Sequence, residues 1–126
     1  MAQFQSLSDS EMEIMKVIWE LAGPVTTSQL LELFAHKGWK VQTLSTFLAR
    51  LVEKGVLQAE KKGKANLYFP ALTQADYHKQ EAQNVIDTMY HGSLLDFLAA
   101  FYGGQGISRE ELKELKQWFD REARHD

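Results

Sequence analysis

Apolar residues recur at helical spacing near the start of the chain. Ser8-Asp9-Ser10-Glu11 matches a capping box, in which the Ser oxygen and the Glu carboxylate satisfy free backbone N–H groups at a helix start. Apolar residues then cover more than half of the helical circumference, which predicts a deeply buried helix. Gly23-Pro24 would end it. The apolar positions are Met12, Ile14, Met15, Val17, Ile18, Trp19, Leu21 and Ala22.

A second, shorter helix is predicted from Thr26. Thr26-Thr27-Ser28-Gln29 is another capping box, and Gly38 is placed to end the helix in a left-handed conformation. A helix of about ten residues is marginal alone, so this one must pack on its neighbours.

The stretch 39–54 predicts a helix with two different faces. One face is polar and positive, and its residue types can read base edges in a DNA groove. This helix follows the one predicted from Thr26 after a short turn that contains Gly38. Two helices joined in this way, the second with a polar outer face, predict a helix-turn-helix. The core-facing residues would be Val41, Leu44, Phe47, Leu48, Leu51 and Val52, and the outward-facing residues would be Gln42, Thr43, Thr46 and Arg50.

The start of this third helix lacks an ordinary capping residue. Lys40 and Val41 stand where Ser, Thr or Asp would be expected, and a Lys there opposes the helix dipole. One interpretation is that a DNA phosphate supplies the missing anion, so that Lys40 contacts the DNA backbone. The other is a slightly frayed helix start.

From Val56 the apolar period changes to that of strands. Residues 56–60 and 65–69 read as two short strands, and Pro70 would end the second because it has no N–H for the ladder. Between them, Lys61, Lys62 and Lys64 surround Gly63, which indicates a tight hairpin turn. A helix-turn-helix followed by such a hairpin is a winged helix, and its lysines would neutralise phosphates. The alternative is a solvated turn that protects an edge strand.

Three further helices are predicted after Pro70. They begin near Thr73, Ser93 and Ser108, and the middle one is short and apolar on most sides. These helices enclose little core, so we expect the same segment of a second chain to cover them; packing back on the winged helix in a monomer is the alternative. The candidate dimerisation residues are Leu94, Leu95, Phe97, Leu98, Phe101, Leu112, Leu115, Trp118 and Phe119.

The predicted fold is therefore mainly α, a winged helix-turn-helix with a C-terminal helical dimerisation region. We place a winged-helix DNA-binding domain at 1–72 and a helical dimerisation domain at 73–126. Charge follows the same division, since residues 36–70 carry seven Lys and Arg against two Glu, whereas 71–126 carry six against ten Asp and Glu. A basic segment beside an acidic one suggests that only the first faces a polyanion. Chance differences in charge are the alternative.

Composition bounds the remaining possibilities. The chain has 126 residues, of which 44% are hydrophobic, and no cysteine, which excludes disulfides, thiolate metal sites and cysteine nucleophiles. No apolar run suits membrane insertion and no secretion signal is evident, so a cytoplasmic location is expected. Asp87 and His91 share a helix without a third metal ligand, so no metal and no cofactor are expected. With no catalytic motif either, we expect a protein that is not an enzyme.

The combination of motifs resembles the penicillinase-repressor (BlaI/MecI/CopY) family of winged-helix transcriptional regulators, over essentially the whole chain. The residues that carry the resemblance are Leu7-Ser8-Asp9-Ser10-Glu11, Val17-Ile18-Trp19, Trp39, Thr43, Thr46, Arg50-Leu51-Val52-Glu53-Lys54-Gly55, Glu60-Lys61-Lys62-Gly63-Lys64, Tyr68, Tyr90-His91-Gly92-Ser93-Leu94 and Ser108-Arg109-Glu110-Glu111-Leu112.

The resemblance implies a homodimeric repressor that binds inverted repeats in double-stranded DNA. The positions that match the family's base-reading face are Gln42, Thr43, Thr46 and Arg50. Some members are released by proteolysis within the dimerisation segment, through a membrane sensor-protease pathway that detects a β-lactam. The matching bond here is Ala100-Phe101, which keeps the family's Phe but not its Asn. The Cys pairs of copper-responsive members are absent. The rival hypothesis is a winged helix used as a protein-interaction module.

Overall fold

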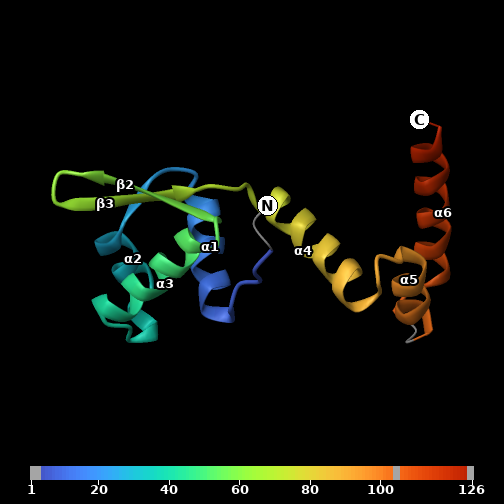
Figure 1. The fold of residues 1–126 in the computed structure, drawn as a ribbon, viewed down its shortest axis with the longest axis horizontal. Helices are drawn as coiled ribbons and strands as arrows, with labels where there is room; N and C mark the ends of the chain where they lie inside the picture. The colour runs from blue at the N-terminus through green and yellow to red at the C-terminus, as the bar shows by residue number, and fades with distance from the viewer. Residues whose placement is uncertain (1–3, 104–105, 125–126) are drawn as a thin grey trace. The chain divides into compact units, whose positions relative to one another are not determined.

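A computed structural model describes residues 4–103 and 106–124 of the chain. By its internal contacts the chain forms two compact units, Met1–Gln83 and Asn84–Asp126, called here the N-terminal and C-terminal units. Figure 1 shows the elements of both. The N-terminal unit contains α1 (Asp9–Leu21), β1 (Val25–Thr26), α2 (Thr27–Leu33), a 3₁₀ turn η1 (Ala35–Lys37), α3 (Val41–Glu53), β2 (Leu57–Lys62), β3 (Ala65–Pro70) and the first turns of α4 (Gln74–Met89).

Both predicted capping boxes in the N-terminal unit are confirmed. The Glu11 N–H donates to Ser8 Oγ at 3.2 Å, and Ser8 N–H donates to Glu11 Oε1 at 2.8 Å. At the start of α2, Thr26 and Gln29 make the same reciprocal pair at 2.9 and 3.1 Å. These bonds satisfy N–H groups that a helix start leaves free. The sequence therefore fixes where α1 and α2 begin.

The small sheet has one strand more than the sequence predicted. β2 and β3 pair antiparallel from Leu57↔Pro70 to Lys62↔Ala65, and Pro70 is the last strand residue as expected. Val25 and Thr26 form β1, which pairs with β3 at Tyr68 and Leu67 and gives the strand order β1-β3-β2. Thr26 was interpreted only as a helix cap, and two residues are too few to show a strand period.

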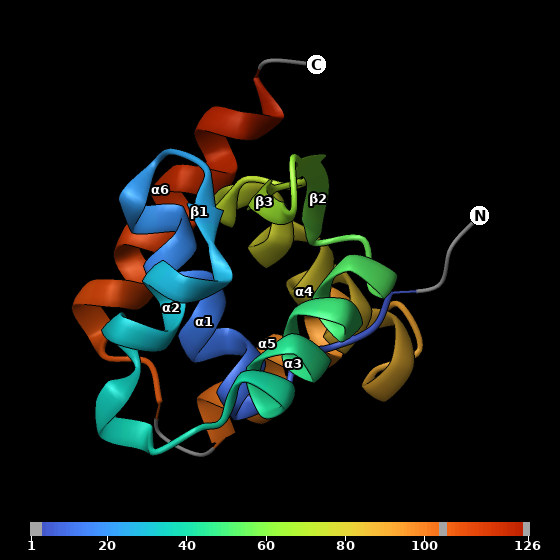
Figure 2. The ribbon, with the colours of Figure 1, turned by 90° about the vertical axis from the view of Figure 1, so that its left-hand side faces the viewer.

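The core of the N-terminal unit lies between the sheet and the first three helices. In Figures 1 and 2 these helices lie on one side of the strands. Seven core side chains have no exposed surface, and burial of this kind is how a small domain gains most of its stability. They are Ile14, Met15, Ile18, Leu44, Leu48 and Leu51, together with Leu30 from α2. This arrangement confirms the predicted winged helix-turn-helix within a mainly α fold.

Two details of the helix pair differ from the expectation. The second helix is α-helical only to Leu33, and a 3₁₀ turn then leads to Gly38, whose φ of 70° is left-handed as predicted. Val41 and Val52 were placed on the core face of the third helix, but they are 55% and 37% exposed. Val41 is the first residue of α3 and Val52 is the last but one, so both lie at the ends of the helix.

The C-terminal unit holds the end of α4, then α5 (Leu94–Gly103) and α6 (Arg109–Ala123). The turn after α4 has His91 at φ 52° and Gly92 at φ 81°, and Gly92 N–H donates to Ile86 O at 2.9 Å, which closes the helix end. Within the parts of 84–126 that the structure describes, no side chain is buried. This unit therefore has apolar helices without a core of its own.

The division between the units falls inside α4. We expected a boundary after residue 72, whereas the contacts divide the chain between Gln83 and Asn84. Tyr77, near the start of α4, is 1% exposed and belongs to the core of the N-terminal unit, so the first turns of α4 are part of that unit. Among the described residues, no helix is both long and apolar enough to span a membrane.

Candidate nucleic-acid interface and candidate dimer surface

The outer face of α3 presents the residues expected to read DNA. Gln42, Thr43, Thr46 and Arg50 are all exposed, whereas Leu48, between them in sequence, has no exposed surface. The helical period alone separates the two sets, because residues three and four apart share a face. The structure thus brings the four predicted residues together on one surface of the helix. Ala49 and Glu53 fall on the same side and are also exposed; the sequence interpretation did not single them out.

The start of α3 is as incomplete as the sequence indicated. Lys40 is the N-cap residue, with an extended backbone at φ −85° and ψ 162°, and its side chain makes no capping hydrogen bond. The first turn of α3 contains no acidic residue. Free N–H groups and a helix dipole at such an end favour an anion. Lys40 itself is exposed beside them.

Thr46 uses its hydroxyl proton within the helix. Its Oγ1 donates to the carbonyl oxygen of Gln42 at 2.9 Å. This bond leaves the oxygen lone pairs and the methyl group of Thr46 for an outside partner. Thr46 can therefore accept a hydrogen bond from a base or contact a thymine methyl, but it has no proton left to donate.

An aromatic cluster sets the turn between α2 and α3. Trp39 stacks on Phe34 with ring centroids 5.2 Å apart, and it meets Phe47 of α3 at 5.1 Å in a tilted contact. Lys37 lies 6.0 Å above the Trp39 ring and pairs with Glu13 of α1 at 2.8 Å. These contacts hold the α3 start against both preceding helices. Such packing is worth about 0.5–1.5 kcal/mol per aromatic pair beyond area burial.

The opposite end of α3 is held by a partly buried ion pair. Lys54, the C-cap residue, places Nζ 2.6 Å from Oε1 of Glu11, whose side chain is 2% exposed. Burial raises the pKa of Glu11, but hydrogen bonds from Lys54 and Ser8 outweigh it, so the pKa lies below its ordinary value. The sequence pattern around Glu11 indicates only a capping box and gives no sign of this contact. Helical spacing carries no signal for a pair so far apart in sequence.

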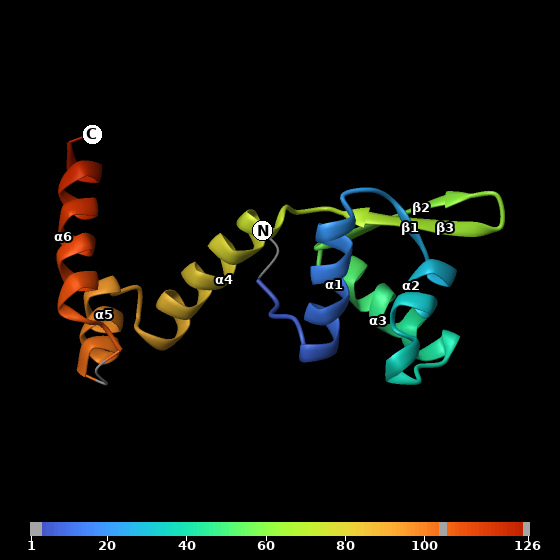
Figure 3. The ribbon, with the colours of Figure 1, turned by 180° about the vertical axis from the view of Figure 1, so that it is seen from behind.

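The wing is the hairpin of β2 and β3, which has a two-residue turn and carries three exposed lysines. Figures 1 and 3 show it extending beyond the helices of its unit. Gly63 has φ 65° at the first position of the turn, where a type II′ hairpin needs glycine. Lys61 and Lys62 belong to β2 and point to opposite faces of the hairpin, and Lys64 completes the turn. All three are exposed, so each is available to contact a phosphate.

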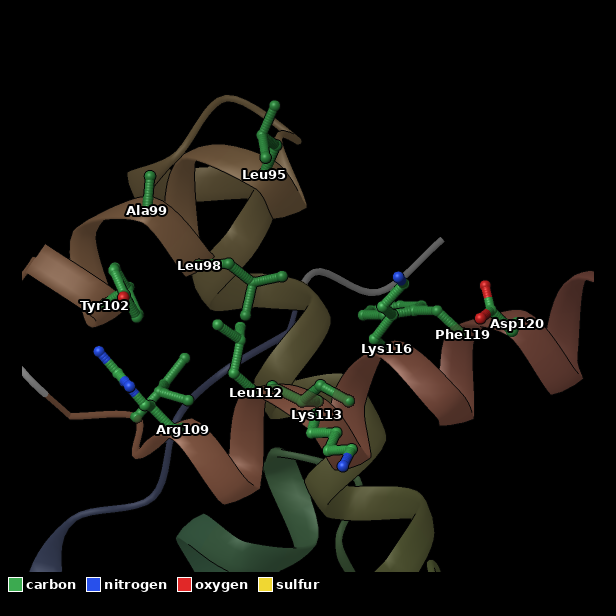
Figure 4. Close-up of a pocket in the computed structure, with 12 residues that line it drawn as sticks. Leu95, Leu98, Ala99, Tyr102, Arg109, Leu112, Lys113, Lys116, Phe119 and Asp120 are labelled. Carbon is green, nitrogen blue, oxygen red and sulfur yellow. The ribbon is translucent and has the colours of Figure 1, made fainter.

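The C-terminal unit exposes most of the predicted dimerisation residues. Between α5 and α6 lies an open groove of about 840 Å³, in which Leu98 and Leu112 point toward one another (Figure 4). Large apolar patches of this kind mark interaction surfaces. The exposed members are Leu94, Leu95, Phe101, Leu112, Trp118 and Phe119, and the partly buried ones are Phe97, Leu98 and Leu115.

The candidate cleavage bond, Ala100-Phe101, lies inside α5. Both residues are exposed. Phe101 stacks on Phe97 at 6.1 Å, and Gly106 N–H donates to Phe101 O at 3.2 Å. A Cβ on Gly106 would come within 2.7 Å of the Phe101 ring. Proteolysis at a helical bond requires local opening.

Metal chemistry finds no support in the described part of the chain, where no three His, Cys, Asp or Glu side chains gather to hold an ion. Asp87 and His91 are four residues apart, but they do not share a helix face, because His91 lies in the left-handed turn after α4.

Comparison with known proteins agrees with the resemblance. The chain is 32% identical over 117 residues to the penicillinase repressor of Bacillus licheniformis, covering 93% of this chain and 91% of the relative. It is 26% identical over 110 residues to the methicillin resistance regulatory protein MecI of Staphylococcus aureus strain N315, covering 87% and 89% of the two chains. The solution structure of the DNA-binding domain of the repressor BlaI matches with a TM-score of 0.53 and 36% identity, over 61% of this chain and 94% of that domain.

The family model described as Penicillinase repressor matches residues 7–121, which include the helix pair, the wing and both C-terminal helices. The chain belongs to the penicillinase repressor family.

Proposed function

We propose that this chain is a homodimeric transcriptional repressor that binds a palindromic operator in double-stranded DNA. The observation that carries the proposal is the outer face of α3, where Gln42, Thr43, Thr46 and Arg50 are exposed together. Arg reads guanine with two hydrogen bonds, and Gln reads adenine in the same way. A face of this composition, on the second helix of a helix-turn-helix, suits the major groove.

The start of α3 and the wing would add contacts to the DNA backbone. The uncapped N–H groups near Lys40 suit a phosphate, and Lys61, Lys62 and Lys64 suit phosphates on the flank. Phosphate contacts of this kind release counterions, so binding should weaken as salt rises. They position the protein, whereas the α3 face supplies the sequence preference.

Dimerisation is supported by the C-terminal unit. Its helices have an apolar groove and no buried side chain among the described residues, which is what half of a shared core would look like. A second copy of the chain is the simplest partner, since two-fold dimers match palindromic sites. We accordingly propose a functional boundary after residue 72, with α4 linking the DNA-binding domain to the dimerisation helices.

Selection of duplexes from a random DNA pool tests the central claim. The protein should enrich an inverted repeat and bind it more tightly than random DNA, by at least about 1000-fold. Equal affinity for enriched and random DNA would contradict the proposal and favour a protein-interaction module. Sedimentation equilibrium should give a dimer. In this proposal the chain acts on DNA in the cytoplasm and performs no catalysis.

We also propose that proteolysis in the dimerisation region releases the operator, with a membrane sensor-protease pathway as the source of the signal. The support is the position of Ala100-Phe101 in α5, within the apolar surface that would hold the dimer, and the exposure of both residues. Placing a site-specific protease sequence across residues 99–102 tests the consequence. Cleavage there should convert dimers to monomers and release operator DNA; a cleaved protein that stays dimeric and bound would contradict it.

A further inference from the structure

Tyr77 fixes the start of α4 in the N-terminal unit. Its side chain is 1% exposed, and its ring lies 5.6 Å from that of Phe4 and 5.9 Å from that of Trp19. Trp19 in turn donates its Nε1–H to the carbonyl of Leu72 at 2.9 Å, just before α4. The first turns of α4 therefore belong to the same rigid packing as α1.

Lys54 fixes the end of α3 from a different direction. Besides its ion pair with Glu11, its Nζ donates to the carbonyl oxygen of Ser6 at 3.0 Å. Glu11 also accepts from Ser8 N–H at 2.8 Å. Residues 4–8, which precede α1 and are called here the strap, thus meet the C-terminal end of α3.

The two sets of contacts converge on a single peptide group. The carbonyl of Ser6 accepts from Lys54, and the N–H of Leu7, at the other side of the same planar peptide, donates to the hydroxyl of Tyr77 at 3.2 Å. The peptide cannot rotate toward one partner without turning from the other. We propose that this peptide couples α4 to α3, so that Tyr77 and Lys54 are positioning residues for operator binding.

The coupling gives the strap a role within the proposed function, on which this inference rests. α4 runs on from Tyr77 to Met89, beyond the end of the N-terminal unit. A displacement of α4 would break the Tyr77 hydrogen bond or pull the strap away from Lys54. The orientation of the α3 reading face is thereby tied to the helix that leads toward the dimerisation residues.

Tyr77→Phe and Lys54→Met, made singly and together in the full chain, test the coupling. The probes are a duplex carrying the inverted repeat selected by the wild-type protein and a duplex carrying one half of it. A palindrome demands two α3 helices at a set spacing, whereas a half-repeat does not. Tyr77→Phe should weaken binding to the whole repeat by about 2- to 10-fold, as expected for one hydrogen bond, and leave the half-repeat unchanged.

The double variant provides the second measurement. Tyr77 and Lys54 act through the same peptide, so their effects on the whole repeat should not add, and the double variant should bind about as well as Lys54→Met alone. Tyr90→Phe and Lys79→Met are matched controls, which remove a hydroxyl or a positive charge elsewhere on the chain. Both controls should bind whole and half repeats in the wild-type ratio.

Thermal unfolding of each variant separates positioning from stability. If Lys54→Met does not fold, Tyr77→Phe alone decides the question, because its ring packing is kept. Equal loss on whole and half repeats, no loss on the whole repeat, or additive effects in the double variant would overturn the coupling while leaving the proposed function intact. A wild-type chain that selects no repeat would instead overturn the proposed function, and the coupling with it.

Discussion

The two units of the chain differ in how far their apolar side chains are exposed. In the N-terminal unit, residues such as Leu44, Leu48 and Leu51 have no exposed surface. In the C-terminal unit Leu95 of α5 is 76% exposed and Phe119 of α6 is 39% exposed. Because burial drives folding, the first unit has a core to hold it together, whereas the second leaves its apolar side chains available for the partner proposed above. The two units thus differ in that the first has a closed core and the second has exposed apolar helices.

The largest expected effect comes from a substitution in the buried core of the N-terminal unit. Leu48→Ala removes a fully buried side chain between α3 and its neighbours and should lower the free energy of unfolding by about 2–5 kcal/mol. Because this core lies within one chain, the loss should not depend on protein concentration. Urea titrations at two concentrations measure it, and a concentration-dependent midpoint for the first unit would contradict the comparison.

The next largest effect is expected from a substitution in the apolar groove that we propose forms the dimer interface. Phe119→Ala removes an aromatic side chain from the groove lining and should raise the dimer dissociation constant by roughly 30-fold, about 2 kcal/mol. Sedimentation equilibrium measures it. Leu21→Ala, which removes a similarly exposed apolar residue from α1, is the matched control and should leave the dimer unchanged. A dimer insensitive to Phe119→Ala would place the interface elsewhere.

A smaller effect sharpens the role of the α3 face. Arg50→Ala, or Thr46→Ala, should weaken binding to the selected operator by about 1–3 kcal/mol and leave random DNA nearly unaffected, because each removes a contact to a base edge. Competition gel shifts measure both affinities. A uniform loss across all DNA would make these residues phosphate contacts instead.

Lys62→Ala should have a weaker and uniform effect. It removes one exposed wing charge from each protomer, so affinity for operator and random DNA should fall alike, and the slope of log affinity against log salt should decrease by about one for each protomer. A loss confined to the operator would show that the wing reads sequence.

The smallest expected effect concerns acid stability. The pKa of Glu11 lies below its unfolded value, near 4.5, so its ion pair stabilises the fold fully above that pH. The contribution is lost as pH falls through the folded pKa, because the protonated carboxyl no longer pairs with Lys54. Chemical unfolding between about pH 7 and pH 3 should therefore show a shallower acid loss in Glu11→Gln than in the wild type. Parallel curves would contradict this.

The features that the sequence predicted are local ones. The capping residues Ser8 and Thr26, the two faces of α3 and the Gly63 turn depend on neighbours within a few positions, and the structure has all of them. The roles of the outward residues in binding stay predictions. What local patterns could not supply was pairing over distance, such as β1 with β3.

Exposure at helix ends and edges was also beyond the sequence pattern. Val41 has the right spacing for the core, yet it is the first residue of α3 and its side chain is exposed. Tyr77 follows the helical period of α4, but it packs on Phe4 and Trp19, which are far from it in sequence. Spacing indicates which face is apolar; it does not say what that face meets.

The strap changes how a minimal DNA-binding fragment should be cut. Trimming to the first helix would start the chain at Ser8, which keeps the capping box and all of α3. Such a fragment would lack the Ser6 carbonyl and the Leu7 N–H, and with them a partner of both Lys54 and Tyr77. A fragment that also ended after residue 72 would lose Tyr77. If the proposed coupling holds, a fragment meant to bind the operator has to keep these amino-terminal residues as well as the first turns of α4.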